Sequence, residues 1–317
     1  KGEDRDTTDW EMVRTRIFAE AEYTKYFYLH FRFNVAGDGS TDLIVSYIQI
    51  KPREGLHFRI GRQFIALTRE DWMYPQDVMT MDFSAHDSLF GIGTSNAIQM
   101  RRTWNHDRLW ACFSDGAFGG GRGFGDQSQG EWALTSRYEH QFWTEDWSIW
   151  DDLVGRRNRP RGLLFGCAAH YQEGGSESQT RWGVLGTADL SYNWDGGQAM
   201  VWASYVRGDS REEGEVDYYG ITAQAGQFVT CTIQLYGRYE YVNPGSREGD
   251  LQDYHAALVG VNWYPFQWTN RYKMTAEGGY LFAPLSKTIV PSGTNVGFAP
   301  ADEGDQFYLR FQMQFGF

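Results

Sequence analysis

The chain has 317 residues and a formal net charge of −12, which argues against a nucleic-acid partner because such a partner requires a basic face. Its mean hydropathy is −0.55, and no stretch approaches the roughly 18 apolar residues of a membrane-spanning helix. Yet 17% of the residues are Phe, Trp or Tyr. A transmembrane β-barrel explains these values together, because its strands alternate apolar and polar residues between two aromatic girdles.

Period-two alternation of apolar and polar residues begins near residue 12 and returns through most of the chain, as in strands with one face in an apolar environment. It is clearest at 26–35, where Phe27, Leu29, Phe31 and Phe33 alternate with polar residues. The pattern predicts fifteen strands, at 12–23, 26–35, 42–51, 55–64, 95–104, 107–115, 132–139, 162–172, 180–194, 198–207, 215–226, 229–242, 252–264, 270–283 and 305–317.

Residues 66–93 interrupt this alternation, and an irregular segment of such length is either functional or disordered. The segment contains Trp, Tyr, Phe and Met residues that favour packing. We therefore expect an ordered constriction loop that folds inward within a single barrel domain spanning residues 1–317.

Two further segments depart from the strand pattern. The glycine-rich stretch 116–125 lacks the GK[ST] ending of a phosphate-binding loop, so a surface loop is the better interpretation. The segment 143–161 is predicted to contain one or two helical turns, with its aromatic residues at the membrane interface. The sequence 226–228 reads as a tight turn because of its glycine.

The cysteines, Cys112, Cys167 and Cys231, lack the spacing of a metal or haem motif. We therefore expect no metal and no cofactor, and we expect Cys167 and Cys231 to be free thiols on the apolar face.

The last strand ends on Phe317, and this ending resembles the closing strand of a bacterial outer-membrane barrel. In such barrels the short turns face the periplasm and the long loops face outward. Because single-chain barrels prefer an even number of strands, we expect about sixteen strands, with an initial strand missing from this sequence or poorly patterned within residues 1–11.

Four short motifs resemble the phosphate-selective porin family, the O and P type outer-membrane porins, and they lie at residues 13–16, 55–64, 260–264 and 307–317. The resemblance implies a sixteen-stranded trimer with an inward loop, an arginine ladder down the lumen, and lysines near the constriction that favour phosphate. Here Lys25, Lys51 and Lys287 fall in turns or loops, so the phosphate preference does not carry over with the fold. Residues 61–63 also resemble alginate-export barrels.

The pore lining is the candidate site, because a porin performs no chemistry. Only five of the 29 basic residues are lysine, and arginine offers a planar fork that suits carboxylates and phosphates, although the bias can also be purely compositional. The predicted lining residues are Arg14, Arg16, Arg32, Arg59, Arg101, Arg137, Arg181, Arg238, Lys273 and Arg310. The constriction loop adds Glu70, Asp71, Asp77, Asp82 and Asp87.

If the loop crosses the lumen, its carboxylates would face wall arginines across a narrow gap and create a transverse field. The alternative is that these charges only neutralise one another in a solvated interior.

The sequence therefore predicts an outer-membrane diffusion channel for small hydrophilic solutes, in contact with lipid and lipopolysaccharide. The arginine-lined lumen makes anions the candidate solutes. The alternative is a structural or partner-docking barrel in an export or other envelope complex. We expect no enzymatic activity, because no GxSxG motif is present and His30, His57 and His170 fall on the polar face of their strands.

Overall fold

The computed structural model describes residues 15–35, 40–116, 130–176, 178, 180–211, 214–243, 245, 253–283 and 306–316. These residues form one antiparallel sheet of fifteen strands, in which each strand pairs with its neighbours in the sequence. In the same ranges, no helix has the length and apolar character needed to cross a membrane. The prediction of an all-β chain with fifteen patterned strands is confirmed. The sixteenth strand, expected to be missing from this sequence or poorly patterned within residues 1–11, stays a prediction because residues 1–11 lie outside the described residues.

Each predicted segment overlaps one strand. The strands are β1 (Thr15–Thr24), β2 (Phe27–Val35), β3 (Thr41–Arg53), β4 (Leu56–Phe64), β5 (Thr94–Trp104), β6 (Asp107–Ser114), β7 (Gly130–Phe142), β8 (Gly162–Gly174), β9 (Thr180–Trp194), β10 (Gly197–Ser210), β11 (Gly214–Phe228), β12 (Ile233–Asn243), β13 (Tyr254–Trp263), β14 (Tyr272–Leu281) and β15 (Gln306–Phe315).

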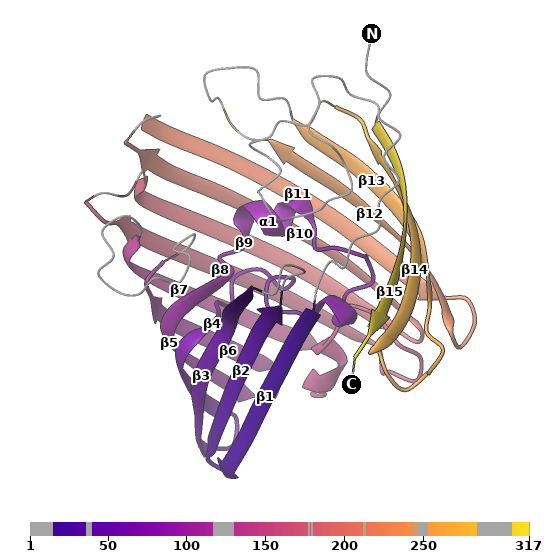
Figure 1. The fold of residues 1–317 in the computed structure, drawn as a ribbon, viewed down its shortest axis with the longest axis horizontal. Coiled ribbons are helices and arrows are strands. Elements are labelled where there is room, and N and C mark those ends of the chain that lie inside the picture. The colour runs from indigo at the N-terminus through magenta and orange to yellow at the C-terminus, as the bar shows by residue number, and fades with distance from the viewer. Residues whose placement is uncertain are drawn as a thin grey trace.

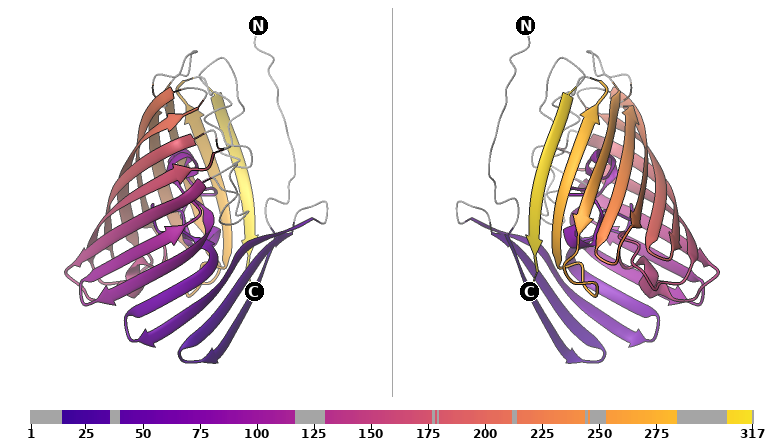
Figure 2. Two further views of the ribbon diagram at one scale, coloured as in Figure 1. Left: turned by 90° about the vertical axis from the view of Figure 1, so that its left-hand side faces the viewer. Right: turned by 90° about the vertical axis from the view of Figure 1, so that its right-hand side faces the viewer.

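The sheet is strongly curled, and its first strands and its last strand approach each other (Figure 1). The two side views in Figure 2 show the indigo N-terminal strands leaning away from the yellow β15 toward their lower ends, while β4 stays paired with β5 along its length. No ladder joins β1 to β15 within the described ranges. The concave side is called the inner face below and the convex side the outer face.

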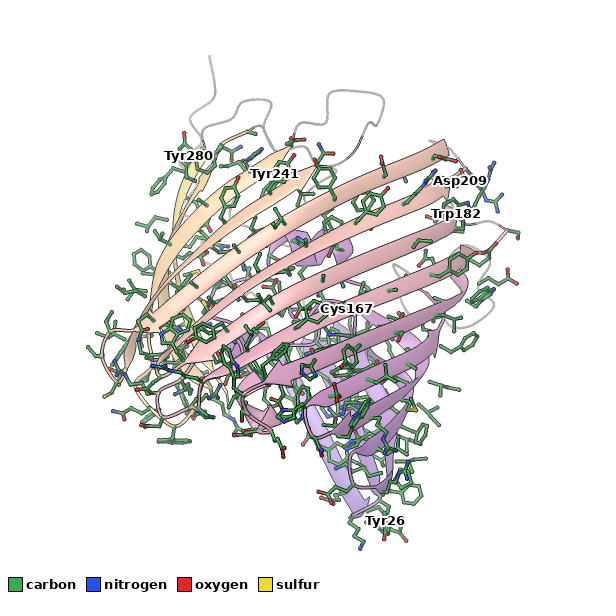
Figure 3. The ribbon with its side chains drawn as sticks, turned by 180° about the vertical axis from the view of Figure 1, so that it is seen from behind. Tyr26, Cys167, Trp182, Asp209, Tyr241 and Tyr280 are labelled. Carbon is green, nitrogen blue, oxygen red and sulfur yellow. The ribbon has the colours of Figure 1, made fainter. Side chains whose placement is uncertain are left out.

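Side chains on the outer face are apolar and exposed. Val259 is 68% exposed on β13 and Phe311 is 76% exposed on β15. Figure 3 views this face, with Cys167 near its middle and Tyr241 and Tyr280 toward the upper rim. A continuous apolar surface over so many strands is far larger than a soluble monomer exposes, and it matches a lipid-facing wall.

The turn between β11 and β12 lies at residues 229–232, so the turn predicted at 226–228 is wrong. Gly226 continues β11 and faces inward, where a Cβ atom would lie 2.9 Å from Sδ of Met79. This glycine makes room for the loop that packs on the inner face and does not form a turn. Cys231 therefore lies exposed in the turn and not on a strand, while Cys167 lies on the outer face as predicted.

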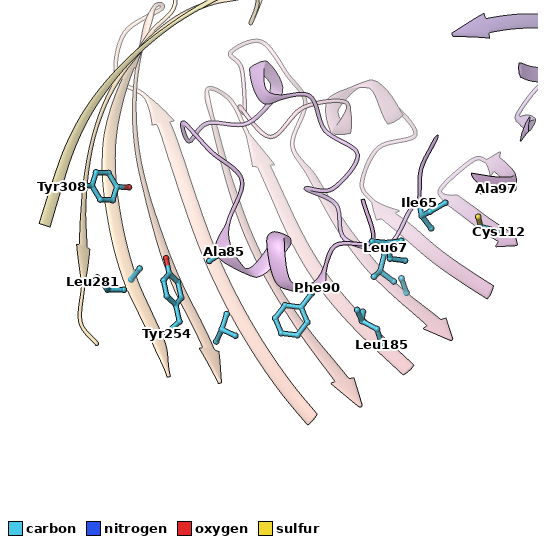
Figure 4. Close-up of a cluster of buried hydrophobic side chains, with 14 residues drawn as sticks. Ile65, Leu67, Ala85, Phe90, Ala97, Cys112, Leu185, Tyr254, Leu281 and Tyr308 are labelled. Carbon is cyan, nitrogen blue, oxygen red and sulfur yellow. The ribbon is translucent and has the colours of Figure 1, made fainter. Parts of the chain in front are cut away.

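The segment between β4 and β5 lies on the inner face and contains a 3-10 helix, η1 (Pro75–Asp77), and a short helix, α1 (Ala85–Phe90). Ser84 caps α1 by accepting a hydrogen bond from the amide of Asp87 (2.9 Å). Figure 4 shows Phe90 of α1 and Leu67 packed against inner-face residues such as Leu185 and Tyr254. Burial of these apolar side chains holds the segment against the sheet.

A second inward segment joins β7 to β8 and contains the 3-10 helix η2 (Trp147–Trp150). Trp150 is 1% exposed, and its indole Nε1 donates to Oε1 of Gln141 (2.8 Å). The prediction that the aromatic residues of this segment lie at the membrane interface is therefore wrong for Trp150. A parallel bridge between Val78 and Leu153 joins this segment to the loop that contains η1.

Candidate functional site

The predicted lining residues that the structure describes lie on the inner-face register of their strands. Direct cross-strand partners share a face, and the pairs Arg59–Gln49, Arg101–His57 and Arg310–Glu277 each join inner-face positions. Arg14 falls outside the described residues. Arg181 lies at the rim, where its side chain is 52% exposed and pairs with Asp209 at 3.0 Å.

The histidines of β2, β4 and β8 lie on the same face. His30 stacks on Tyr47 with ring centroids 5.2 Å apart, and Nδ1 of His57 lies 3.2 Å from Nη2 of Arg101. His170 contacts Oγ1 of Thr135 at 2.8 Å.

On the wall formed by β12–β15, the predicted basic side chains form hydrogen bonds or ion pairs with the loop. Nη1 of Arg238 donates to Oγ1 of Thr80 (2.9 Å) and lies 3.4 Å from Oε1 of Glu70, while Nε lies 2.6 Å from Oε1 of Glu240. The ammonium group of Lys273 donates to the main-chain oxygen of Val78 (3.0 Å).

Arg310 completes this wall. Its Nη1 donates to Oδ2 of Asp82 (2.7 Å) and its Nη2 donates to Oε1 of Glu277 (2.8 Å). The basic groups of this wall therefore bind loop oxygens or neighbouring carboxylates directly.

The remaining loop acids are held by groups of the loop or by a turn. Oδ2 of Asp71 accepts hydrogen bonds from the amides of Ile92 (3.1 Å) and Gly93 (3.0 Å). Asp87 accepts a short hydrogen bond from the Thr68 hydroxyl, and Asp77 accepts one from Nδ2 of Asn270 (3.2 Å). Glu70 and Asp82 touch their arginines, so no open gap separates the carboxylates from the wall at these pairs, in contrast to the expected transverse field.

Burial changes the ionisation of the loop acids. Desolvation raises the pKa of Asp71 to about 7 and that of Asp77 to about 6, and it holds the pKa of Asp87 well above its usual value. Desolvation also lowers the pKa of His86 to about 3, and Nε2 of this histidine lies 2.8 Å from Oγ of Ser204 on β10. Burial therefore favours the neutral forms of these carboxyl groups and of the His86 imidazole.

Arg137 forms the centre of a buried network on β7. Its guanidinium donates to Oδ2 of Asp189 (2.6 Å), Oε1 of Glu139 (2.9 Å) and the main-chain oxygen of Leu67 (2.9 Å). Two carboxylates therefore neutralise this arginine, and its third bond fixes the start of the loop.

The wall formed by β2–β6 differs, because several of its arginines lack carboxylate partners. Arg32 is 3% exposed, and its guanidinium carbon lies 4.2 Å from the ring centre of Tyr74. Nε of Arg59 donates to Oε1 of Gln49 (2.8 Å). Among the described residues, Arg32, Arg59 and Arg101 form no ion pair with Asp or Glu, whereas nearby Arg108 lies 3.8 Å from Glu139.

Two arginines of this region escaped the sequence prediction. Arg108 shares the inner face of β6 with Trp110 and Cys112, so strand parity alone could have identified it. Arg69 lies in the loop and donates to the main-chain oxygen of Trp150 (2.8 Å), 81 residues away. No local sequence pattern predicts this contact.

A cavity of about 210 Å³ lies between this wall, the loop and η2. No group of three or more His, Cys, Asp or Glu side chains able to hold a metal ion occurs in the part of the chain that the structure describes. The site is thus a charged interior whose two walls differ in how fully their arginines are neutralised.

Comparison with known proteins identifies the architecture. No family model matches the chain, and no curated protein matches it. The anion-selective porin from Comamonas acidovorans is similar over 95% of this chain and 87% of its own, with a TM-score of 0.60 and 12% identity. The trimer form of OmpT, an outer membrane protein of Vibrio cholerae, covers 94% of this chain and 91% of its own, with a TM-score of 0.56 and 13% identity.

A loop-deletion mutant of the same OmpT covers 84% of both chains, with a TM-score of 0.56 and 14% identity. The fold is that of an outer-membrane, porin-like barrel. These similarities support the barrel and do not single out the phosphate-selective porin family that the motifs resemble.

Proposed function

We propose that the protein is an outer-membrane porin that lets small hydrophilic solutes diffuse passively and prefers anions. The observation that carries the preference is the uneven neutralisation of the interior. On β12–β15 loop oxygens and carboxylates bind Arg238, Lys273 and Arg310, whereas on β2–β6 Arg32 and Arg59 have no carboxylate partner among the described residues. Uncompensated positive charge in a low-dielectric lumen attracts anions and repels cations.

In this proposal the predicted wall arginines line the path, and residues 66–93 form its constriction within a single barrel domain. The loop acids act chiefly as anchors, because Glu70 and Asp82 bind Arg238 and Arg310. The wall arginines of β12 and β15 neutralise the negative charge of these two acids. The solute path therefore runs along the other side of the loop, past the arginines of β2–β6.

The proposal includes contact with lipid and lipopolysaccharide on the outer face and assembly as a homotrimer. The exposed apolar surface supports the lipid contact, and the trimer form of the similar OmpT barrel supports the assembly. Membership of the phosphate-selective family rests on the sequence motifs alone. Two described lysines lie on the inner face, Lys273 of β14 and Lys51, which belongs to β3 and not to a turn as expected. Loop carbonyl groups occupy the ammonium of Lys273, and the ammonium of Lys51 lies 5.6 Å from the ring centre of Tyr28, so these residues do not favour a phosphate-specific lysine cluster.

A planar-bilayer experiment under a KCl gradient tests the function. The purified protein should conduct, and the sign of the reversal potential should indicate chloride preference. The double variant Arg59→Gln and Arg101→Gln should lower the chloride preference several-fold, whereas Arg207→Gln, which removes an exposed charge paired with Glu215, should leave it unchanged.

Absence of any conductance would refute the channel and favour the structural or docking alternative. A cation-selective current from the wild type would overturn the anion preference and leave the channel standing.

A further inference from the structure

The cavity beside β2–β6 has a lining that combines charge with aromatic surface. Its basic residues are Arg32, Arg59, Arg69, Arg101 and Arg108, and this set is called the arginine pocket. They come from four strands and the loop, so only the folded chain brings them together. The cavity encloses about 210 Å³.

The arginine pocket is short of negative charge. Among the described residues, Asp151 is the only carboxylate that lines it, and Glu139, which lies 3.4 Å from Arg69 and 3.8 Å from Arg108, also pairs with Arg137. Arg32 is 3% exposed, and its Nε and Nη1 atoms have no hydrogen-bond partner in the part of the chain that the structure describes. A buried cation without a counter-ion is unfavourable, so this arrangement is stabilised when an anion enters.

Aromatic rings alternate with the guanidinium groups of the pocket. The Arg59 guanidinium lies 4.8 Å from the ring centre of Tyr47, and the Arg32 guanidinium lies 4.2 Å from that of Tyr74. Trp72 and Trp110 stack with centroids 5.0 Å apart and planes 26° from parallel. These planar groups offer stacking surfaces to a flat ligand as well as charge to an anionic one.

We propose that the arginine pocket is a binding subsite for small aromatic carboxylates of the benzoate class. This inference rests on the proposed function and names its preferred solute. A cavity of roughly 150 Å³ holds a benzene ring, so a pocket of about 210 Å³ has room for that ring and one carboxylate. The carboxylate would bind the guanidinium groups and the ring would stack on the aromatic side chains, a combination that phosphate and aliphatic acids cannot use fully.

The first test uses the wild-type protein with matched probes. Benzoate should reduce the chloride current through the reconstituted channel at lower concentration than cyclohexanecarboxylate, which has the same charge and similar size but no aromatic face. Phosphate should act more weakly than benzoate, and neutral benzyl alcohol should act least. Equal potency of benzoate and cyclohexanecarboxylate would overturn the aromatic preference, and stronger action by phosphate would reassign the pocket to inorganic oxyanions.

A second test measures binding without conduction. Trp72 and Trp110 line the pocket, so benzoate should change the tryptophan fluorescence of the detergent-solubilised protein in a saturable manner. Arg59→Gln with Arg101→Gln should weaken the binding at least tenfold, and Tyr47→Leu should weaken benzoate binding more than cyclohexanecarboxylate binding. Arg207→Gln serves as the matched control because the Arg207 side chain is 56% exposed and does not line the pocket.

The two proposals fail in different ways. A channel that conducts chloride but shows neither block nor saturable binding by benzoate refutes the subsite and leaves the porin function intact. A protein that binds benzoate but never conducts refutes the porin function and leaves the site. Circular dichroism of each variant excludes misfolding, and the wild-type comparison of benzoate with cyclohexanecarboxylate does not depend on any variant.

Discussion

Replacing Arg238 by methionine should release the inward loop from β12. This guanidinium is buried, it donates to Thr80 and to the main-chain oxygen of Asp82, and it lies beside the carboxylates of Glu70 and Glu240. Methionine fills much of the same volume but leaves both carboxylates without their cation.

The expected loss follows from the burial of both partners. Removing one partner of a buried ion pair typically costs about 3–5 kcal/mol. We expect a value near the lower limit, because Glu70 keeps its hydrogen bond from the Ser84 amide (3.1 Å) and Arg310 still holds Asp82 (2.7 Å). Since about 1.4 kcal/mol corresponds to a factor of ten, the docked-to-released ratio should fall roughly a hundredfold.

Hydrogen exchange detected by mass spectrometry measures this ratio. The amide of Ser84 donates to Glu70 and the amide of Ala85 donates to Glu240 (2.7 Å), so both report directly on docking. Their exchange should accelerate roughly a hundredfold in Arg238→Met, whereas Arg207→Gln, which breaks an exposed and solvent-screened pair, should leave it unchanged. Unchanged exchange of Ser84 and Ala85 in Arg238→Met would refute the anchoring role.

Three further changes test other parts of the structure. Asp71→Asn should raise the midpoint of heat unfolding more at pH 8 than at pH 5. The folded-state pKa of Asp71 is about 7, so the wild type loses stability as the pH rises from near 4 through 7. An equal gain at both pH values would contradict this reasoning. Gly61→Ala should lower the refolding yield in lipid, because Gly61 has φ +130° and an added Cβ would lie 2.3 Å from the Ser46 carbonyl oxygen. A normal yield would show that the strand adapts to the side chain. Val259 is 68% exposed on the outer face. Near the bilayer midplane, Val259→Arg should lower the free energy of unfolding in vesicles by about 2–4 kcal/mol, measured as a lower midpoint of urea unfolding. An unchanged midpoint would place Val259 away from lipid.

The strands could be predicted from the sequence because a membrane wall imposes a local rule. Each residue of a strand faces either the apolar or the polar side, so parity along β4 or β15 was sufficient to place Arg59 and Arg310 on the inner face. The position of the irregular segment between β4 and β5 was visible for the same reason, since it is where the rule stops.

The contacts of the interior could not be predicted, because they join segments far apart in the chain. The sequence contains no local signal that the Asp82 carboxylate reaches Arg310, 228 residues later, or that Trp150 turns inward to meet Arg69. Gly226 is a further long-range case. Its lack of a side chain makes room for Met79 of the loop, whereas the local sequence alone predicts a turn at this glycine. Which arginines stay without a counter-charge depends on these long-range pairs.

The bridge between Val78 and Leu153 has a mechanical consequence. It ties the segment that leaves β4 to the segment that leaves β7, and the amide of Leu153 donates to the main-chain oxygen of Asp77 (2.6 Å). The same loop is bound to β12, β14 and β15 through Arg238, Lys273 and Arg310, so the two segments form a cross-brace between distant parts of the wall. A curled sheet braced in this way resists flattening, because moving its walls apart would break the contacts of Arg238, Lys273 and Arg310 with the loop.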